Sequence, residues 1–397
     1  MDTRTGLPVV GMVGGGQLAR MTHQAAISLG QSLRVLAAGE HDSAGLVAGE
    51  VVYGHHTDLE ALRSFARGVD VVTFDHEHVP GEHLLTLANE GFQLRPGPYA
   101  LSFAQDKLLM RERLAGLGFP GPPFTEVTGV EDVLKFADAR GWPVVLKAAR
   151  GGYDGKGVWP LDSPDDARGL IPELLEAGTP LLVETRVTMR RELSALVARS
   201  PFGQGAAWPV VETVQSAGIN TEVLAPAPGL TARRTQEAQD LALRIAESLD
   251  VAGVLAVELF ETDGGLLVNE LAMRPHNSGH WTMDGSATSQ FEQHLRAVLD
   301  YPLGATELLS PTVMANVLGA ATPPAMRPDE RLHHLFARFP DVRVHLYGKG
   351  ERPGRKLGHV NLLGELTPRL REKARLAAHW LSHAEWLDGY EIHRGER

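Results

Sequence analysis

Two apolar stretches in the second half of the chain are separated by a short glycine-containing link, and together they predict a β-hairpin. The link covers residues 262–265, and a link of this length between strand-like runs is typical of a hairpin turn. If the turn is centred on Gly264, Glu258 lies opposite Glu270, with Cβ atoms about 5 Å apart. Two ionised carboxylates at that separation repel each other unless a cation lies between them or one takes a proton. The hairpin therefore predicts a divalent metal, and its oxygen ligands suit Mg²⁺ beside nucleotide phosphates.

The residues after this hairpin favour a functional site over an exposed hairpin whose acids only solubilise it. Apolar neighbours flank both carboxylates, and Arg274, His276, Asn277 and His280 follow the second strand directly. Cationic, amide and imidazole side chains so close to a metal pair can bind or polarise a substrate. We therefore expect the segment 273–281 to belong to the same site.

The composition limits the classes of protein that this chain can join. Its 397 residues, 43% hydrophobic and 22% charged, predict two or three domains that each bury a core. The absence of cysteine excludes thiol nucleophiles, thiolate metal sites and disulfides. A net charge of −11 argues against a nucleic-acid partner, and no apolar run is long enough to span a membrane. We expect a cytoplasmic protein with neither nucleic acid nor membrane as a partner.

Residues 7–110 alternate strand-like and helix-like segments, which predicts a parallel sheet covered by helices. The first strand ends in a G-x-G-x-x-A pattern at 14–19, and Glu40 follows a second strand. This pattern is typical of dinucleotide binding, but a glycine turn before a helix can bind any phosphate. A dinucleotide-dependent dehydrogenase is therefore one alternative, although nothing later in the chain resembles a hydride-transfer site.

A polar loop at 73–80 follows another predicted strand of this first unit. Ligands usually bind at the carboxyl ends of such strands, so Glu77 could hydrogen-bond a sugar hydroxyl or an amine. The alternative is an ordinary polar loop, and the residue types do not decide between the two. His76 and His78 flank Glu77, but the sequence offers no third ligand for zinc.

A strand lysine and a glycine-rich loop form the second informative stretch. Lys147 ends an apolar strand, and the following segment 151–157 contains four glycines whose N–H groups can fold over phosphates. The loop is not a Walker A loop, because Lys156 is followed by Gly157 and not by serine or threonine. Each feature alone is also common in proteins that bind no nucleotide, and only their combination favours a triphosphate.

Further along the chain, two acidic residues and one basic loop complete the set of candidate side chains. Glu184 ends an apolar strand that could offer backbone groups to an adenine ring, and Glu192 could bind a ribose hydroxyl. Four cations lie in the loop 349–356 around a Pro-Gly pair, which argues against a helical charge stripe. We interpret this loop as a receptor for an anion, with a solvated basic turn as the alternative.

Two helix starts can also be predicted in the second half. Thr231 is a candidate N-cap for a helix ending near Leu249, and Ser286 is one for a helix ending near Leu299.

Several of these residues resemble the ATP-grasp ligases. The resemblance covers Lys147, the loop 152–157, Glu184, Glu192 and the pair of Glu258 and Glu270. Four longer strings at 15–21, 73–80, 269–282 and 347–359 extend it over nearly the whole chain. They resemble the bicarbonate-dependent members of that family that carboxylate 5-aminoimidazole ribonucleotide in purine biosynthesis. Biotin carboxylase and glycinamide ribonucleotide synthetase share the ATP machinery, but they are not expected to carry both of the last two strings.

The resemblance implies a combined α/β and α+β fold. It consists of a Rossmann-like, pre-ATP-grasp N-terminal domain at 1–110 and an ATP-grasp fold of two subdomains. The smaller is a lid at 111–190 with the glycine-rich loop, and the larger, at 191–397, carries the metal hairpin and the basic loop. The resemblance also implies a homodimer.

In the implied reaction, bicarbonate attacks the γ-phosphoryl group of ATP to give carboxyphosphate, which carboxylates the exocyclic amine of the ribonucleotide. The expected cofactors are ATP and Mg²⁺, with bicarbonate as co-substrate. The metal ligands are Glu258 and Glu270, and the catalytic residues are Arg274, Tyr153 and Lys349.

The residues expected around ATP come from the predicted helix at 105–114, the lid, and the larger subdomain with its hairpin. They are Lys107, Lys147, Gly152, Tyr153, Asp154, Gly155, Lys156, Gly157, Glu184, Thr185, Arg186, Val187, Glu192, Gln215, Asn269 and Glu270. The residues expected around the ribonucleotide come from the first turn, the polar loop, the segment after the hairpin and the basic loop. They are Gly16, Gln17, Leu18, Glu77, His276, Asn277, Ser278, Lys349, Arg352, Arg355 and Lys356.

The chain departs from the family pattern at three positions. Met273 stands where the family usually has proline, Asp75 where it has glutamate, and Gln215 where histidine is expected. Three alternatives remain open at this point: another ATP-grasp carboxylate–amine ligase, the dehydrogenase, and a nucleotide-sensing module that binds ATP without turnover.

Overall fold

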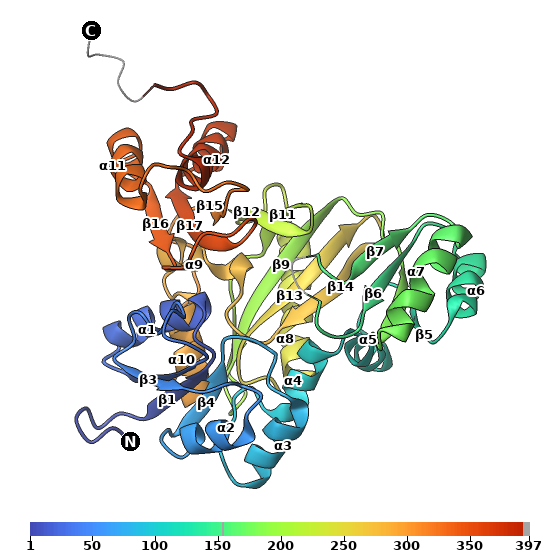
Figure 1. The fold of residues 1–397 in the computed structure, drawn as a ribbon, viewed down its shortest axis with the longest axis horizontal. Helices are drawn as coiled ribbons and strands as arrows, with labels where there is room; N and C mark the ends of the chain where they lie inside the picture. The colour runs from blue at the N-terminus through green and yellow to red at the C-terminus, as the bar shows by residue number, and fades with distance from the viewer. Residues whose placement is uncertain (153–154, 392–397) are drawn as a thin grey trace.

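The computed structural model describes residues 1–152 and 155–391, and its strands form three sheets (Figure 1). A four-stranded sheet lies near the N-terminus, a second four-stranded sheet forms the arm drawn in green, and a nine-stranded sheet lies between them. The predicted combination of a parallel α/β unit with later α+β units is confirmed.

The N-terminal unit is a parallel sheet covered by helices. Its elements are β1 (Val9–Val13), α1 (Gln17–Ser28), β2 (Ser32–Ala37), β3 (Glu50–Tyr53), α2 (Leu59–Ala66), β4 (Val71–Phe74), α3 (Gly81–Asn89) and α4 (Pro98–Gln105). The strand order is β3-β2-β1-β4, and β1 and β4 are buried along their whole length, as expected for strands covered on both faces. Val13 pairs with Phe74, so the 14–19 turn and the 75–80 loop leave the sheet side by side.

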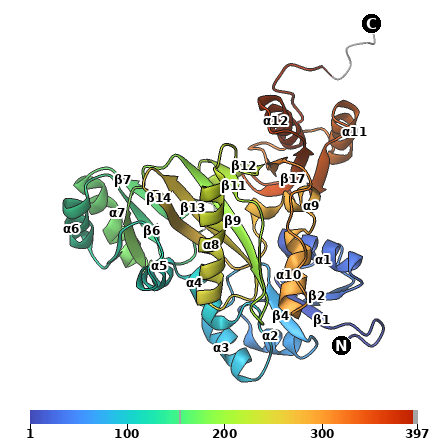
Figure 2. The same cartoon turned by 180° about the vertical axis from the view of Figure 1, so that it is seen from behind.

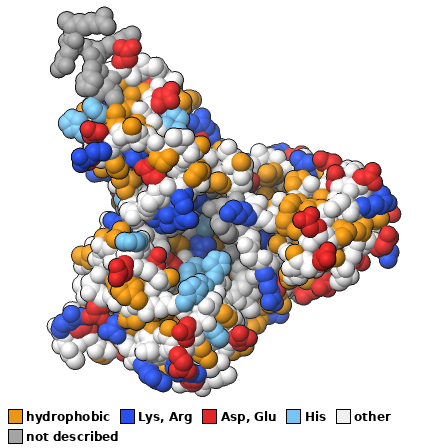
Figure 3. All heavy atoms as spheres, in the orientation of Figure 1, with side chains coloured by type: hydrophobic (Ala, Val, Ile, Leu, Met, Phe, Trp, Pro, Cys, Tyr) orange, Lys and Arg blue, Asp and Glu red, His pale blue; other side chains and the backbone are white. Residues whose placement is uncertain are grey.

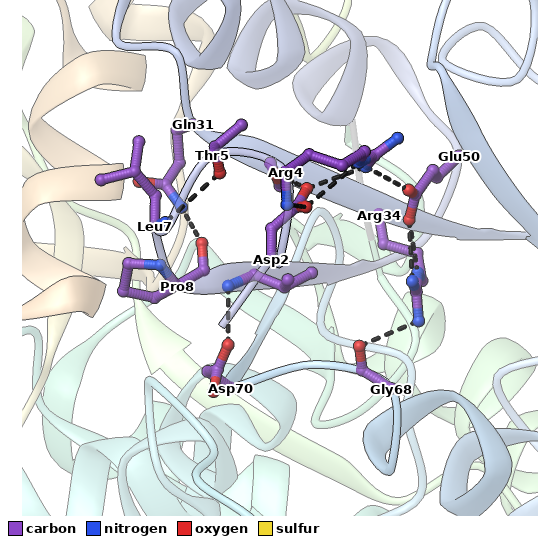
Figure 4. Close-up of polar contacts among 12 residues, drawn as sticks. Asp2, Arg4, Thr5, Leu7, Pro8, Gln31, Arg34, Glu50, Gly68 and Asp70 are labelled. Atoms are coloured by element: carbon purple, nitrogen blue, oxygen red, sulfur yellow. Dashed lines mark hydrogen bonds and ion pairs between the residues drawn. The ribbon is translucent and has the colours of Figure 1, made fainter.

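Ion pairs hold the edge strand β3 to the segment before β1 (Figure 4). Arg4 bridges Asp2 and Glu50, and Arg34 Nη2 lies 2.8 Å from Glu50 Oε2. Arg34 also donates to the carbonyl of Gly68 at 2.9 Å. This ladder fixes a short strand whose outer edge pairs with no other described strand.

The arm is an antiparallel sheet with two helices on one face. Its elements, with the helix that leads into it, are α5 (Lys107–Gly116), β5 (Phe124–Val127), α6 (Val130–Arg140), β6 (Val144–Ala148), β7 (Val158–Leu161), α7 (Pro164–Glu176) and β8 (Leu181–Thr185). The strand order is β5-β8-β6-β7. Val133 of α6 and Ile171 of α7 pack with Leu146 and Val183 in one apolar core.

The large sheet begins with a group of antiparallel strands packed on one long helix. Its first elements are β9 (Arg191–Arg199), β10 (Gly205–Ala207), β11 (Val211–Ser216), β12 (Ile219–Ala225), α8 (Ala232–Ser248), β13 (Gly253–Thr262) and β14 (Gly265–Ala272). Helix α8 crosses one face of these strands (Figure 2), where Leu241 and Ile245 share a core with Leu255 and Val257. Thr231 is the N-cap of α8, as predicted, and accepts from the Arg234 amide.

The same sheet continues into the C-terminal lobe in the order β14-β13-β9-β11-β12-β15-β17-β16, with β10 beside β9. The remaining elements are a 3₁₀ turn η1 (Asn277–Gly279), α9 (Thr282–Gly285), α10 (Gln290–Leu299), β15 (Thr312–Leu318), α11 (Pro328–Arg338), β16 (Arg343–Leu346), β17 (Lys356–Leu363) and α12 (Pro368–His383).

The prediction of Ser286 as a helix N-cap is wrong. Helix α10 begins at Gln290, and its N-cap is Ser289, whose hydroxyl accepts from the Glu292 amide at 3.2 Å. Ser286 instead pairs with Leu308 in an isolated β-bridge. Both serines precede a run with helical periodicity, and only the fold decides which one caps the helix.

Among the described residues, no helix combines the length and the apolar character that crossing a membrane requires.

Candidate active site

The predicted hairpin consists of β13 and β14. It lies where the N-terminal unit, the arm and the C-terminal lobe meet (Figure 1). Glu258 pairs with Glu270 in its ladder, as predicted, but the turn is not centred on Gly264. Thr262 pairs with Gly265, which alone would set Glu258 opposite Asn269. A register shift between Glu258 and Leu259 brings Glu270 opposite Glu258. Figure 3 shows Lys, Arg and His side chains gathered in a hollow between the N-terminal unit, the C-terminal lobe and the arm. The candidate side chains from distant parts of the chain converge on this hollow.

The two carboxylates of the hairpin form a pair that favours a cation. Partial burial, followed by the nearby Glu270 carboxylate, raises the pKa of Glu258 to about 8. Lys107 of α5 forms an ion pair with Glu270 and supplies one positive charge. Within residues 1–152 and 155–391, no group of three or more His, Asp or Glu side chains is arranged to hold a metal. Two oxygen donors beside a lysine therefore fit a Mg²⁺ that takes its other ligands from phosphate and water.

A buried ion cluster fixes Lys147 of β6. Its Nζ lies 2.7 Å from Glu184 Oε2, and Arg111 Nε lies 2.5 Å from the other oxygen of the same carboxylate. Burial works against the charge of Glu184, but Lys147 and Arg111 together lower its pKa below the ordinary value. Burial lowers the pKa of Lys147, and Glu184 opposes that shift. The lysine is thereby held as a fixed cation facing Asn269, whose Oδ1 lies at 3.2 Å.

Arg111 is a site residue that the sequence did not identify. Besides Glu184, it donates to the backbone carbonyls of Val268 and Asn269, at 2.7 Å each. It therefore ties the arm to strand β14. One signal was available, since Arg111 lies four residues after Lys107 and so on the same face of a helix.

The backbone predicted to meet the adenine ring lies at the end of β8, where the arm joins the large sheet. Thr185, Arg186 and Val187 lie at this junction, and the buried Thr185 hydroxyl has no hydrogen-bond partner among the described residues. Glu192 accepts a hydrogen bond from Gln215, while burial, the larger effect, raises its pKa. The structure thus brings together Glu192, which was predicted near the ribose, and Gln215, which was predicted near ATP, from separate strands.

Two predicted residues of the glycine-rich loop, Tyr153 and Asp154, lie outside the described residues. Of the others, Gly155 lies so close to Gly218, in the turn between β11 and β12, that a Cβ there would contact its Cα. Lys156 is exposed. Gly155 therefore lies against the turn between two strands of the large sheet.

Arg274 and Glu77 come from different lobes and form an ion pair. Arg274 Nε lies 2.8 Å from Glu77 Oε2, and both side chains are largely buried. The preceding Met273 is fully buried in the main core, so the departure from proline fills the interior. The pair places a cation and a carboxylate together between the hairpin and the N-terminal sheet.

The side chains of the segment 276–278 contact other residues of the protein. His276 Nε2 lies 3.4 Å from Glu258 Oε1, and its Nδ1 lies 2.9 Å from the Ser278 hydroxyl. Asn277 exchanges two amide hydrogen bonds with Asn316 of β15, at 2.9 and 2.7 Å. Burial, the nearby Arg274 and Lys356 lower the pKa of His276 well below its usual value, so this imidazole is neutral. A supporting role fits these three side chains better than direct substrate contact.

The glycine turn at 14–19 already binds an anion of the protein itself. Asp75 Oδ2 accepts from the Gly16 amide at 2.5 Å, and a Cβ at Gly14 would collide with the same carboxylate. Burial raises the pKa of Asp75 to about 6, against the opposing effect of that amide. Glu40, the residue expected to bind a dinucleotide ribose, is exposed. The position where a pyrophosphate would meet the helix is occupied, which removes support for the dehydrogenase alternative.

Gln17 lies at the start of α1 and the buried Leu18 follows it.

The basic loop 349–356 packs against the end of β15 and faces this turn. Gly319 donates to the Arg355 carbonyl at 2.8 Å and accepts from the Gly354 amide at 2.8 Å, and a side chain at Gly319 would collide with the loop backbone. Lys349 donates to the Gln17 side chain. Burial and then the neighbouring Arg355 lower the pKa of Lys349 to about 8. Arg352 is exposed, and Arg355 and Lys356 are half-buried.

Comparisons with known families match most of the chain in three consecutive pieces. Residues 7–105 match the Ribonucleotide synthetase preATP-grasp domain, and residues 112–291 match the ATP-grasp domain. Residues 312–373 match the Phosphoribosylaminoimidazole carboxylase C-terminal domain.

Among curated proteins, the chain is similar to N5-carboxyaminoimidazole ribonucleotide synthase of Mycobacterium tuberculosis. The two are 63% identical over 98% of this chain and 91% of the relative. The enzyme of the same name from Corynebacterium ammoniagenes is 50% identical over 97% of this chain and 94% of its own length.

Solved structures agree with this similarity. N5-carboxyaminoimidazole ribonucleotide synthetase of Thermus thermophilus superposes with a TM-score of 0.84 at 38% identity, covering 96% of this chain and all of that one. The Aspergillus clavatus synthase in complex with ADP and 5-aminoimidazole ribonucleotide gives 0.82 at 33% identity, covering 94% and 97%.

Proposed function

The chain belongs to the N5-carboxyaminoimidazole ribonucleotide synthase family of ATP-grasp ligases, and from this membership we propose how its residues divide the reaction. The protein is an enzyme with that synthase activity in purine biosynthesis. Our proposal concerns which side chains bind each substrate, which hold the metal, and which stabilise the transferring groups.

We propose that the nucleotide lies between the arm and the large sheet. Lys147 would neutralise its phosphates, the segment 184–187 would meet the adenine ring, and Glu192 with Gln215 would bind the ribose. Lys107 would leave Glu270 and contact the phosphates once a metal binds the hairpin. The support is the fixed cation at Lys147 and the adjacent carboxylate pair.

Glu258 and Glu270 would hold Mg²⁺, which supplies charge neutralisation on the phosphoryl oxygens when bound. A bicarbonate oxygen attacks the γ-phosphorus and ADP leaves, giving carboxyphosphate. Arg274 would stabilise the negative charge of carboxyphosphate by a bidentate contact, in exchange for its bond to Glu77. The exocyclic amine then takes the carboxyl carbon, phosphate leaves, and the amine loses a proton.

The ribonucleotide would bind with its 5′-phosphate at the basic loop. Lys349, Arg352 and Arg355 concentrate positive charge next to the amides at Gln17 and Leu18. Within the described residues, these three cations form no ion pair with a carboxylate, and that observation carries the proposal. Asp75 and Asp42 act on Lys349 and Arg355 by charge, but burial and the neighbouring cations outweigh them. Glu77 would face the aminoimidazole amine or the ribose.

The domain boundaries at residues 110 and 190, the homodimer and the cytoplasmic location stay predictions. The domain division is supported by the change from a parallel to an antiparallel sheet after α4.

A phosphate-release assay tests the assignment of substrates. We expect release from MgATP to require both bicarbonate and 5-aminoimidazole ribonucleotide, and to fall to background when either is omitted. Arms with acetate, formate or glycinamide ribonucleotide should stay at background. Turnover with glycinamide ribonucleotide in place of 5-aminoimidazole ribonucleotide would contradict the proposal and favour another carboxylate–amine ligase.

A further inference from the structure

Gln290, the first residue of α10, makes an unusual set of contacts with the segment that follows the metal hairpin. Its side chain is fully buried. Its Oε1 accepts from the backbone N–H of His276 at 2.8 Å, and its Nε2 donates to the backbone carbonyl of the same residue at 2.8 Å. The amide thus pairs with one backbone residue in the way that a neighbouring strand would.

The remaining hydrogen-bonding capacity of Gln290 also holds this segment. Nε2 lies 3.0 Å from His280 Nδ1, and the Gln290 backbone amide donates to the Thr282 hydroxyl at 2.9 Å. That hydroxyl donates to the carbonyl of Gly279 at 2.6 Å. A Cβ at Gly279 would collide with the Gln290 amide, so the glycine is required by the clamp. The segment 276–282 is therefore fixed by Gln290 at three points, His276, His280 and Thr282.

The geometry at His276 connects this clamp to the metal pair. The Ser278 amide donates to His276 Nδ1, so the neutral ring carries its proton on Nε2, which faces Glu258. A donor that faces a metal-binding carboxylate in this way orients that carboxylate. Displacing the backbone of His276 would move this donor and also Arg274, two residues earlier.

We infer that Gln290 is a positioning residue for the reaction, because its amide holds the His276 backbone so that His276 faces Glu258 and Arg274 faces the hollow. The expected effect on the reaction rate rests on the proposed function. The expected effect on the backbone at 276–282 does not. Gln290 acts through the backbone that it holds and does not contact the hollow itself.

The chain offers a matched control on the same helix. Gln293 is also fully buried, and its amide makes the same two-bond contact with the backbone of Gly304, at 2.8 and 2.7 Å. Gly304 belongs to the segment between α10 and β15, which carries none of the proposed site residues. Gln290→Met and Gln293→Met therefore each remove a two-bond contact with one backbone residue, next to the site in the first case and away from it in the second. Gln290→Met also removes the contact with His280 in the same segment.

Hydrogen–deuterium exchange tests the structural half of the inference. In the full chain, Gln290→Met should accelerate exchange of the 276–282 amides at least tenfold. Gln293→Met should accelerate exchange only around Gly304. Unchanged exchange at 276–282 in Gln290→Met would overturn the clamp, whatever the reaction of the enzyme.

Steady-state kinetics test the functional half. We expect Gln290→Met to lower the kcat of bicarbonate- and ribonucleotide-dependent ATP turnover at least tenfold, with the KM for ATP within twofold. Gln293→Met should keep both parameters within twofold at a comparable loss of denaturation midpoint. Equal kcat values in the two variants would overturn the positioning role. If the methionine variant does not fold, Gln290→Glu keeps the acceptor for the His276 amide and loses the donor, and the same kcat criterion applies to it.

Turnover by the wild-type enzyme separates the two proposals. If the wild type shows no ribonucleotide-dependent turnover, the proposed function fails, while the exchange result still decides the clamp.

Discussion

The two ends of the hollow hold their cations in opposite ways. At the nucleotide end, Lys147 lies 2.7 Å from Glu184, and Arg111 compensates the same carboxylate. At the other end, Lys349 and Arg355 repel each other, and burial lowers the pKa of both. A cation that has a carboxylate partner is held in place whether or not a ligand binds. Asp75 and Asp42 only partly offset the repulsion at the second end, so an anion that binds between these cations would stabilise them further.

This difference supports the proposal that the two ends bind different ligands. The nucleotide end is preorganised, and its ion cluster also joins the arm to strand β14 through Arg111. Repulsion among the cations of the basic loop destabilises the free protein, and a bound phosphate would relieve this repulsion. The metal hairpin lies between the two ends, and Lys356 of the loop already lowers the pKa of Glu258 by its charge.

The largest effect is expected at the hairpin, which both ends share. Glu270→Gln should lower kcat by about two to three orders of magnitude, because charge stabilisation by the metal is worth several kcal/mol. The measurement is ATP turnover with bicarbonate and ribonucleotide at saturating Mg²⁺. Asp263→Asn, on the exposed turn of the same hairpin, is the control and should keep the wild-type rate. A Glu270→Gln rate near wild type would remove the metal assignment.

The basic loop should show a selective effect on one substrate. Arg355→Ala should raise the KM for 5-aminoimidazole ribonucleotide by roughly 10- to 100-fold, since a charge-assisted hydrogen bond contributes about 1.5–3 kcal/mol. The KM for ATP should stay within twofold. Arg369→Ala, exposed on α12, is the control. A parallel rise of both Michaelis constants would show that the loop does not separate the two ligands.

The pH dependence should follow Lys349, whose pKa is about 8 in the free enzyme. Binding of a phosphate needs the protonated amine, so kcat/KM for the ribonucleotide should fall about tenfold per pH unit well above pH 8. The folded pKa is below that of the unfolded chain, so the cost of this charge to stability is full below pH 8 and is relieved as pH rises. Lys349→Arg should remove the fall, and an identical profile in that variant would assign it to another group.

The smallest effect is expected at the ribose corner. Gln215→Leu removes the hydrogen bond to Glu192 and should raise the KM for ATP about fivefold, since such a bond contributes about 1 kcal/mol. The KM for the ribonucleotide should not change. This selectivity is the opposite of that expected for Arg355→Ala. A change in the KM for the ribonucleotide alone would contradict the placement of Gln215 beside ATP.

The sequence predicted those features that local rules decide. The glycine-containing link predicted the hairpin of β13 and β14 and so the proximity of Glu258 and Glu270, although their direct pairing depends on a register shift between Glu258 and Leu259. The short edge strand β3 was missed, because its four residues show no periodicity and ion pairs hold them in place.

Residues that act through tertiary contacts could not be found in this way. Arg111 meets Glu184 only after α5 packs on the arm, and Asp75 occupies the glycine turn only because β1 and β4 are neighbours. Gln290 is an ordinary polar residue of a helix until its contact with His276 is seen.

The unfolding free energy of two ligand-free variants tests the contrast between the two ends most directly. Lys147→Met leaves Glu184 buried with a single partner and should lose about 2 kcal/mol or more. Arg355→Met relieves repulsion within the basic loop and should match or exceed the wild type in denaturant titrations. An equal loss of stability in both variants would contradict the account, because it would show that the loop cations are compensated in the free protein.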